Sequence, residues 1–117
     1  MRNICDFEVG DHELREMIFS DDSLAITFRN TSAVREFTVY FSKVEYVTLE
    51  SNLMQNVIEN IVEFNIDECE HIDFLRIRPW ISALMKDNSD KYKCIYIEPI
   101  AGAEMVIICD HYNIVHH

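Results

Sequence analysis

Residues 20–28 read SDDSLAITF and contain the clearest strand pattern in the chain. Leu24, Ile26 and Phe28 alternate with small or polar residues, so they fall on one face of a β-strand. The Asp and Ser residues before them are typical of a turn, because such side chains bond to nearby backbone groups. We therefore predict a hairpin whose first strand lies within residues 7–19.

The same kind of pattern predicts strands farther along the chain. Residues 34–49 are rich in β-branched and aromatic side chains but too long for one average strand, so we expect a bend or break near Ser42-Lys43. Residues 92–97 and 104–109 are apolar and flank a turn at Ala101-Gly102, which predicts a second hairpin. Residues 72–77 also resemble a strand.

Two segments favour a helix instead. The i, i+4, i+5, i+8 spacing of an amphipathic helix is present in Leu53, Val57, Ile58 and Ile61, with Ser51 or Asn52 as the cap. Pro79 suits the first turn of a second helix over residues 80–86. The resulting fold class is α+β: a mostly antiparallel β-sheet, as a sandwich or a curved sheet, with one or two short helices in a single domain, 1–117.

Length and composition limit the class of protein. The chain has 117 residues and 49% hydrophobic content, enough for a real core and too much for disorder. The longest apolar runs are a few residues, so we predict no membrane span. No hydrophobic signal region opens the sequence, and four cysteines fit free thiols, so we expect a cytoplasmic protein. The His116-His117 pair is typical of an expression-tag remnant, and both are set aside.

The charge distribution is the strongest functional signal. Residues 44–75 carry eight acids and no lysine or arginine, and the whole net charge of −11 arises within residues 1–75. Such a field attracts a cationic partner and repels nucleic acid and anionic lipid, which favours a basic protein as the partner. The alternative, that the acidic residues serve only solubility, stays open. The candidate partner-binding patch is Glu59, Glu63, Asp67, Glu68, Glu70 and Asp73.

Metal, catalytic and nucleic-acid sites have weaker signals. Potential ligands occur in Asp67-Glu68-Cys69-Glu70-His71 and Cys109-Asp110-His111, but their spacing lacks the Cys and His pairs that zinc sites use. There is no nucleophile elbow and no glycine loop for phosphate, so we predict no enzyme, no metal and no cofactor. Basic residues cluster only in two pairs, Arg76/Arg78 and Lys91/Lys93, which are too few for nucleic-acid binding.

Two short segments suggest a family. Asp11-His12-Glu13-Leu14 and then Ser23-Leu24-Ala25-Ile26-Thr27-Phe28 resemble the opening strands of immunity proteins from bacterial contact-dependent growth-inhibition and related polymorphic toxin systems. The resemblance covers about the first quarter of the chain and implies a cytosolic, non-enzymatic inhibitor of a toxin, such as a nuclease. No binding residues transfer from it, because immunity interfaces differ between cognate pairs.

The charge and the resemblance predict an acidic immunity protein that blocks the active site of a basic toxin domain, expected to be a nuclease. One alternative is a small metal-binding protein or enzyme that uses His12, Cys69, His71, Cys109 and His111. Another is a subunit of a larger assembly, whose partner surface would be large and apolar. The oligomeric state is left open.

Overall fold

A computed structural model describes residues 2–30, 32, 35–50, 56–64, 91–102 and 104–117. These residues form an all-β antiparallel structure of nine strands and contain no helix. The strands are β1 (Arg2–Asn3), β2 (His12–Ser20), β3 (Ser23–Asn30), β4 (Arg35–Ser42), β5 (Tyr46–Glu50), β6 (Val57–Phe64), β7 (Lys93–Ala101), β8 (Glu104–Cys109) and β9 (His111–His116).

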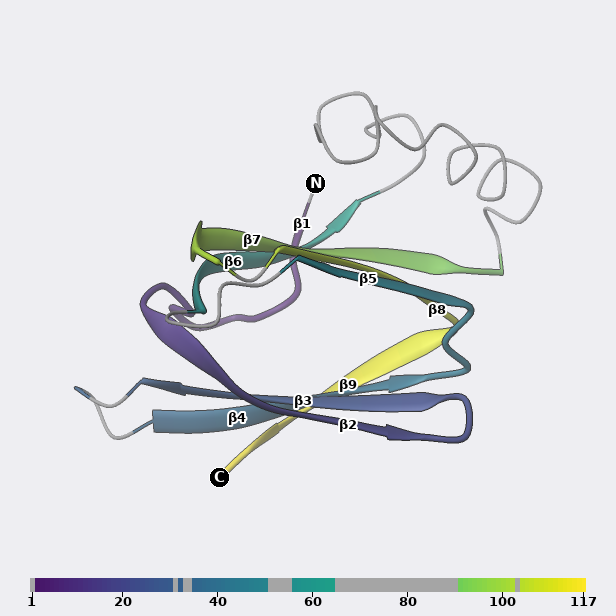
Figure 1. Cartoon of the computed structure of the whole chain (residues 1–117), viewed down its shortest axis with the longest axis horizontal. Helices are drawn as coiled ribbons and strands as arrows, with labels where there is room; N and C mark the ends of the chain where they lie inside the picture. The colour runs from purple at the N-terminus through teal and green to yellow at the C-terminus, as the bar shows by residue number, and fades with distance from the viewer. Residues whose placement is uncertain (1, 31, 33–34, 51–55, 65–90, 103) are drawn as a thin grey trace.

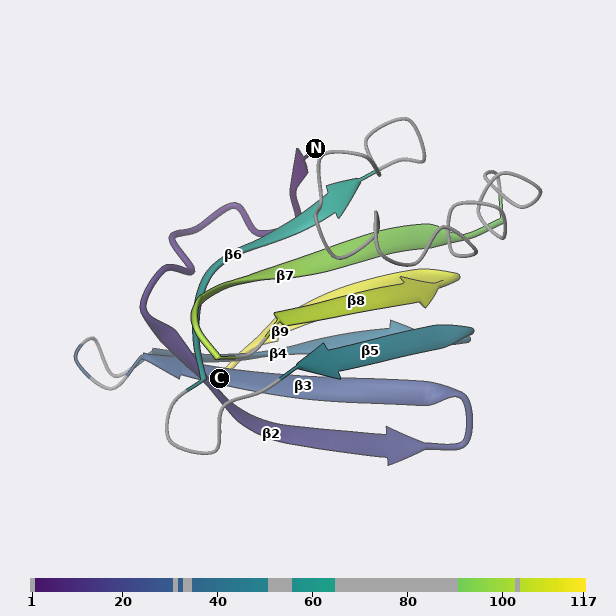
Figure 2. The same ribbon diagram turned by 45° about the horizontal axis from the view of Figure 1, so that its top comes forward.

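The sheet is open and folds over on itself. Its strand order is β5-β8-β7-β6-β2-β3-β4-β9, and β1 pairs with β6. Strands β2, β3, β4 and β9 form one layer, and β5, β6, β7 and β8 form the other (Figures 1 and 2). The layers join where the first two residues of β2, His12 and Glu13, pair with Ile58 and Val57 of β6.

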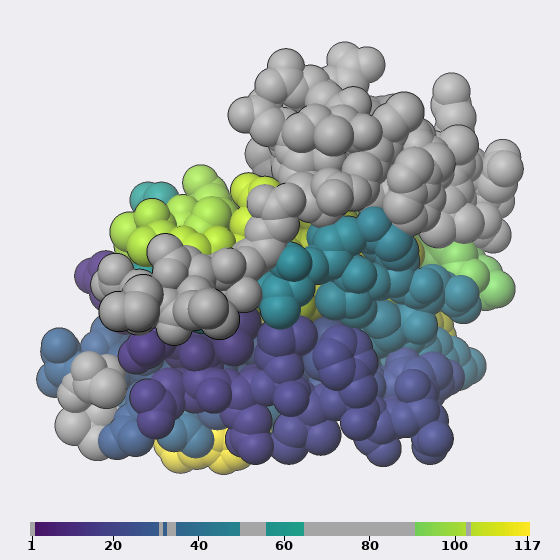
Figure 3. Space-filling view, in the orientation of Figure 1, coloured from purple at the N-terminus to yellow at the C-terminus, as the bar shows by residue number. Residues whose placement is uncertain are grey.

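The core lies between the two layers. Alternation places every second side chain of each strand on the inner face. The buried core cluster is Val9, Leu24, Ile26, Phe28, Phe37, Val39, Phe41, Ile58, Ile61, Ile95, Ile97, Met105, Ile107 and Cys109. Side chains fill the space between the layers on the face seen in Figure 3. In β8 the run Met105–Cys109 is buried on both faces, as its unbroken apolar sequence suggests.

Three strand predictions are confirmed. The turn at Asp21 and Asp22 joins β2 to β3 in the expected hairpin, and Asp21 has the positive φ of 54° that such turns use. The long segment breaks after Ser42, where Lys43 has φ 51° and ends β4. Strands β7 and β8 form the second hairpin, with Gly102 at φ 85° in its turn.

The helix predicted through Leu53, Val57, Ile58 and Ile61 is wrong over its described part, because Val57–Phe64 is strand β6. Its first apolar position, Leu53, and the predicted caps, Ser51 and Asn52, lie outside the described residues. The register of β6 against β7 shifts at two points between Val57 and Asn60. Glu59 is an extra residue on β6 at the second shift. It moves the next inward-facing side chain from two positions after Ile58 to three, so Ile58 and Ile61 both reach the core. A bulged strand therefore imitates the i, i+3 spacing of a helix. The α part of the α+β class is thus not found in the described residues.

Other predicted elements fall elsewhere. The helix over residues 80–86 and the strand over residues 72–77 lie outside the described residues. Across the part of the chain that is described, no helix is long and apolar enough to cross a membrane.

Strand β9 was not predicted, since its end was set aside as a tag remnant. In the structure the His116 ring packs edge-on against Phe7, with the ring centroids 4.6 Å apart. The backbone N–H of His117 donates to Glu36 O at 3.0 Å. Both histidines thus contribute contacts to the β4–β9 side of the sheet.

Candidate functional site

Two of the six predicted partner-binding acids, Glu59 and Glu63, lie in the described part of β6. Asp67, Glu68, Glu70 and Asp73 lie outside the described residues. Because the alternation shifts between Ile58 and Ile61, Glu63 shares the inner face with Ile61, whereas Glu59 next to Ile58 points away from the core. The two carboxylates therefore have different surroundings.

Glu63 is engaged inside the fold. Its Oε1 lies 2.9 Å from Arg2 Nη2 and accepts a hydrogen bond of 3.0 Å from the Tyr112 hydroxyl of β9. Burial, followed by this bond to Glu63, raises the pKa of Tyr112, and the charge of Glu63 raises the pKa of Arg2. This Arg2–Glu63–Tyr112 network links β1, β6 and β9, so Glu63 stabilises the fold.

Glu59 is exposed and lines a hollow of about 480 Å³ beside the N-terminal segment. The hollow is also lined by Asn3, Cys5, Asp6, Phe7, Glu8, Val9 and Asn60, and we call it the acidic hollow for its carboxylates, Asp6, Glu8 and Glu59. Within the described residues, none of these three acids forms an ion pair with a lysine or arginine. Their combined negative charge is thus open to an external cation.

Long-range pairing builds this hollow. Arg2 and Asn3 pair with Glu63 and Val62, and the Ile4 N–H donates to Ile61 O at 3.1 Å. These bonds carry the N-terminal segment along β6, so that Asp6 and Glu8 reach Glu59. Sequence reasoning missed Asp6 and Glu8 because no local pattern reports that pairing.

Glu8 is held in place within the hollow. Its Oε1 accepts a hydrogen bond of 3.0 Å from the Gly10 backbone N–H. A Cβ at Gly10 would lie only 2.9 Å from that same oxygen, so a side chain there would push the Glu8 carboxylate out of this position. One of the three carboxylates is therefore oriented by a local hydrogen bond.

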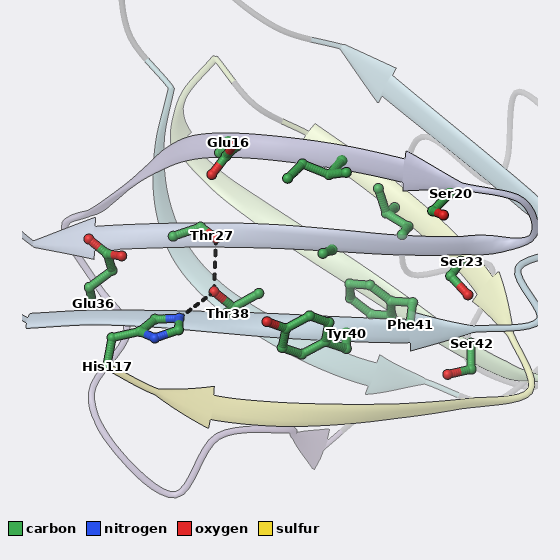
Figure 4. A pocket seen from close by; sticks show the side chains of 13 residues that line it. Glu16, Ser20, Ser23, Thr27, Glu36, Thr38, Tyr40, Phe41, Ser42 and His117 are labelled. Carbon is green, nitrogen blue, oxygen red and sulfur yellow. Dashed lines mark hydrogen bonds between the residues drawn. The ribbon is translucent and has the colours of Figure 1, made fainter.

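A second concave surface, which we call the outer groove, lies on the outward face of β2, β3 and β4. Its volume is about 550 Å³. The floor follows the small side chains of β3, and larger side chains of the neighbouring strands form the walls (Figure 4). It is lined by Glu16, Ile18, Ser20, Ser23, Leu24, Ala25, Thr27, Glu36, Thr38, Tyr40, Phe41, Ser42 and His117.

A chain of hydrogen bonds crosses one end of the groove. Thr27 Oγ1 lies 2.8 Å from Thr38 Oγ1, which in turn lies 2.7 Å from His117 Nε2. In nucleophilic catalysis, a hydroxyl is activated by a neighbouring imidazole, and a third group orients that imidazole. The described residues supply no hydrogen bond to the other ring nitrogen of His117, and Thr38 is only 3% exposed. Thr27, Thr38 and His117 therefore bond to one another and form a polar floor at this end of the groove.

The described Cys and His residues of the metal alternative lie in unlike places. His12 is 1% exposed, with Nδ1 2.9 Å from Val9 O and its ring against Phe37. Cys109 belongs to the core, whereas His111 is exposed beside Asp110. Cys69 and His71 lie outside the described residues. In the described ranges no group of three or more His, Cys, Asp or Glu side chains is placed to hold a metal ion.

Two of the described cysteines, Cys5 and Cys109, have raised thiol pKa values and are poor nucleophiles. Burial raises the pKa of Cys109 to about 12, and burial with the nearby Asp6 charge raises the pKa of Cys5 to about 12. Because the thiolate is the reactive form, both side chains stay largely protonated at neutral pH. Thiol catalysis at these two positions is disfavoured.

Comparisons of the chain with protein-family models, with curated proteins and with solved structures return no match.

Proposed function

We propose that this protein is an acidic, cytoplasmic inhibitor that binds a basic toxin domain, in the manner of the immunity proteins it resembles. A nuclease must present cations to bind phosphate, so an acidic surface can occupy that site as a substrate mimic. The observation that carries the proposal is the acidic hollow, where Asp6, Glu8 and Glu59 gather without an ion-pair partner among the described residues.

The net charge of −11 supports the same function. A strongly one-signed protein attracts an oppositely charged partner from a distance, and such steering raises association rates to about 10⁸ M⁻¹s⁻¹ or more at low salt. The hydrogen bond from the Gly10 N–H already orients the Glu8 carboxylate, which lowers the conformational entropy that this side chain loses on binding.

The test begins with capture of partners from the lysate of the source organism, at low salt and at about 0.5 M salt, where the Debye length shrinks to a few ångströms. The captured protein is identified by mass spectrometry, and its affinity and nuclease activity are then measured with purified components. We expect a basic protein whose binding weakens at high salt and whose activity falls when the inhibitor is added.

A matched pair of charge-reversed variants locates the contact. Asp6→Lys/Glu59→Lys alters the acidic hollow, while Asp22→Lys/Glu45→Lys makes the same change in net charge at exposed acids outside that hollow. We expect the first pair to weaken binding at low salt by at least about tenfold and the second by less than about threefold. Equal losses in both variants would show that only overall charge matters.

A further inference from the structure

The outer groove follows β3 because of the order of residues in that strand. Ser23, Ala25 and Thr27 occupy successive outward positions and are all small. They span four residue steps, about 13 Å of strand. Glu16 and Ile18 of β2 stand on one side and Thr38 and Tyr40 of β4 on the other, so the groove follows the strand direction (Figure 4).

The middle of this groove exposes apolar surface. The register places Ile18 of β2 and Tyr40 of β4 on either side of Ala25. Ile18 is 52% exposed and Tyr40 43% exposed, and Val115 of the adjoining β9 is 37% exposed on the same face. The outward face of an antiparallel sheet is ordinarily polar, so clustered apolar side chains here indicate a contact surface.

One end of the groove is acidic. Glu16 pairs across the strands with Thr27, which pairs with Thr38, and Glu36 lies one outward position beyond Thr38 on β4. Their backbone positions lie two strands apart and two residues apart along the strand direction, about 12 Å. Within the described residues neither forms an ion pair, although Arg29 is the cross-strand neighbour of Glu36. A cation above Thr27 would therefore have the Glu16 carboxylate directly across on β2 and the Glu36 carboxylate diagonally across on β4.

We propose that the outer groove binds an extended segment of a partner protein with an apolar residue followed, two positions later, by lysine or arginine. In an extended chain these side chains project in the same direction about 7 Å apart. Ala25 and Thr27 have that spacing, so the apolar side chain lies between Ile18 and Tyr40 while the cation lies between Glu16 and Glu36. The groove is separate from the acidic hollow, and its occupant need not be the toxin.

The probe is a set of short synthetic peptides added to the ¹⁵N-labelled full chain and followed by NMR. One peptide contains Phe-Ser-Lys, a second Phe-Ser-Glu and a third Ser-Ser-Lys, all with capped ends and Gly-Ser flanks. We expect Phe-Ser-Lys to shift the amides of Ala25, Thr27, Thr38 and Tyr40 at peptide concentrations up to about 1 mM, near the Kd of a weak contact. The other two peptides should bind at least about fivefold more weakly.

Two kinds of variant test the geometry. Ile18→Ala should weaken Phe-Ser-Lys binding about three- to tenfold, while Ile100→Ala, at 53% exposure on β7, should leave it unchanged. Glu16→Gln/Glu36→Gln should remove the preference for Lys over Glu. Folding of each variant is checked from the dispersion of its own spectrum.

No shift in the groove at millimolar peptide, equal response to all three peptides, or equal loss from Ile18→Ala and Ile100→Ala would overturn the proposal. These outcomes leave the immunity function untouched, because all the variants keep Asp6, Glu8 and Glu59. Conversely, loss of toxin binding in Asp6→Lys/Glu59→Lys leaves the peptide result unaffected. The two proposals can therefore fail independently.

Discussion

Glu63 and Glu59 belong to one predicted patch, yet replacing Glu63 should destabilise the fold, whereas replacing Glu59 should change its stability little. Glu63→Ala removes the acceptor of the Tyr112 hydroxyl and the partner of Arg2. A hydrogen bond to a charged group contributes about 1.5–3 kcal/mol. Since the Glu63 side chain is 23% exposed and part of its solvation survives folding, we take the low end, about 1.5 kcal/mol. Arg2 is exposed and adds little.

Urea denaturation at pH 7 measures this loss, and a double-mutant cycle with Tyr112→Phe isolates the pair. We expect each single variant to lower the free energy of unfolding by about 1–2 kcal/mol and the double variant to lose about 1 kcal/mol less than their sum. Glu59→Ala, the control on the same strand, should change stability by less than about 0.5 kcal/mol because its side chain is exposed.

Additive losses for Glu63→Ala and Tyr112→Phe would refute the network. A Glu59→Ala variant as unstable as Glu63→Ala would also refute it, since the two carboxylates would then contribute equally to the free energy of unfolding. If the prediction holds, binding studies of the acidic span should use Glu59, because changes at Glu63 confuse affinity with folding.

Three further predictions concern the fold. Phe37→Ala should lower the free energy of unfolding by about 3–5 kcal/mol in urea titrations, because Phe37 is fully buried and its ring contacts Phe7 and Phe28. Gly102→Ala should cost about 1 kcal/mol by the same assay, since its φ of 85° disfavours a side chain. Burial raises the pKa of Cys109 from 9.0 to about 12, so the folded state keeps this proton longer than the unfolded chain does. That stabilisation is complete below pH 9 and is lost as pH rises toward 12, by about 1.4 kcal/mol per unit. Cys5 has a similarly raised pKa and adds a slope of its own, so Cys109→Ala should reduce the total slope in denaturation series from pH 8 to 11 without abolishing it.

The hairpins could be predicted because their signals are local. The Asp21-Asp22 turn and the alternation of Leu24, Ile26 and Phe28 lie within a few residues of one another, and so do the strands on either side of Gly102. Each needs only turn chemistry and a period of two, which the sequence displays directly.

Strand β6 could not be predicted in the same way, because a bulge changes its period. Ile58 and Ile61 are both buried at a spacing of three, and that spacing favours a helix when the partner strand is unknown. The β-branched residues Val57, Ile58, Ile61 and Val62 were the available signal for a strand. Strand β9 also had a signal, since Tyr112 and Ile114 are separated by Asn113 and followed by the β-branched Val115.

The candidate sites were predicted less well than the strands because both combine distant parts of the chain. Glu59 was singled out from its charge, but Asp6 and Glu8 join it only through the pairing of β1 with β6. The small residues Ser23, Ala25 and Thr27 are visible in the sequence. Their walls depend on the registers of β2 and β4, which no local pattern fixes.

A run of like charges therefore predicts an electrostatic field better than it predicts a contact. Along β6 the fold assigns Glu63 to an internal network and leaves Glu59 outside, although both contribute equally to the net charge of −11. The field accounts for attraction at a distance, where only total charge counts. Affinity at contact depends on which carboxylates remain unpaired and held in place, and in the described residues the acidic hollow meets both conditions through Glu59 and Glu8. Under the proposed function, a partner that recognises charge alone would lose the same affinity from any charge reversal of equal size, whereas one that recognises the acidic hollow would lose more from a reversal within it.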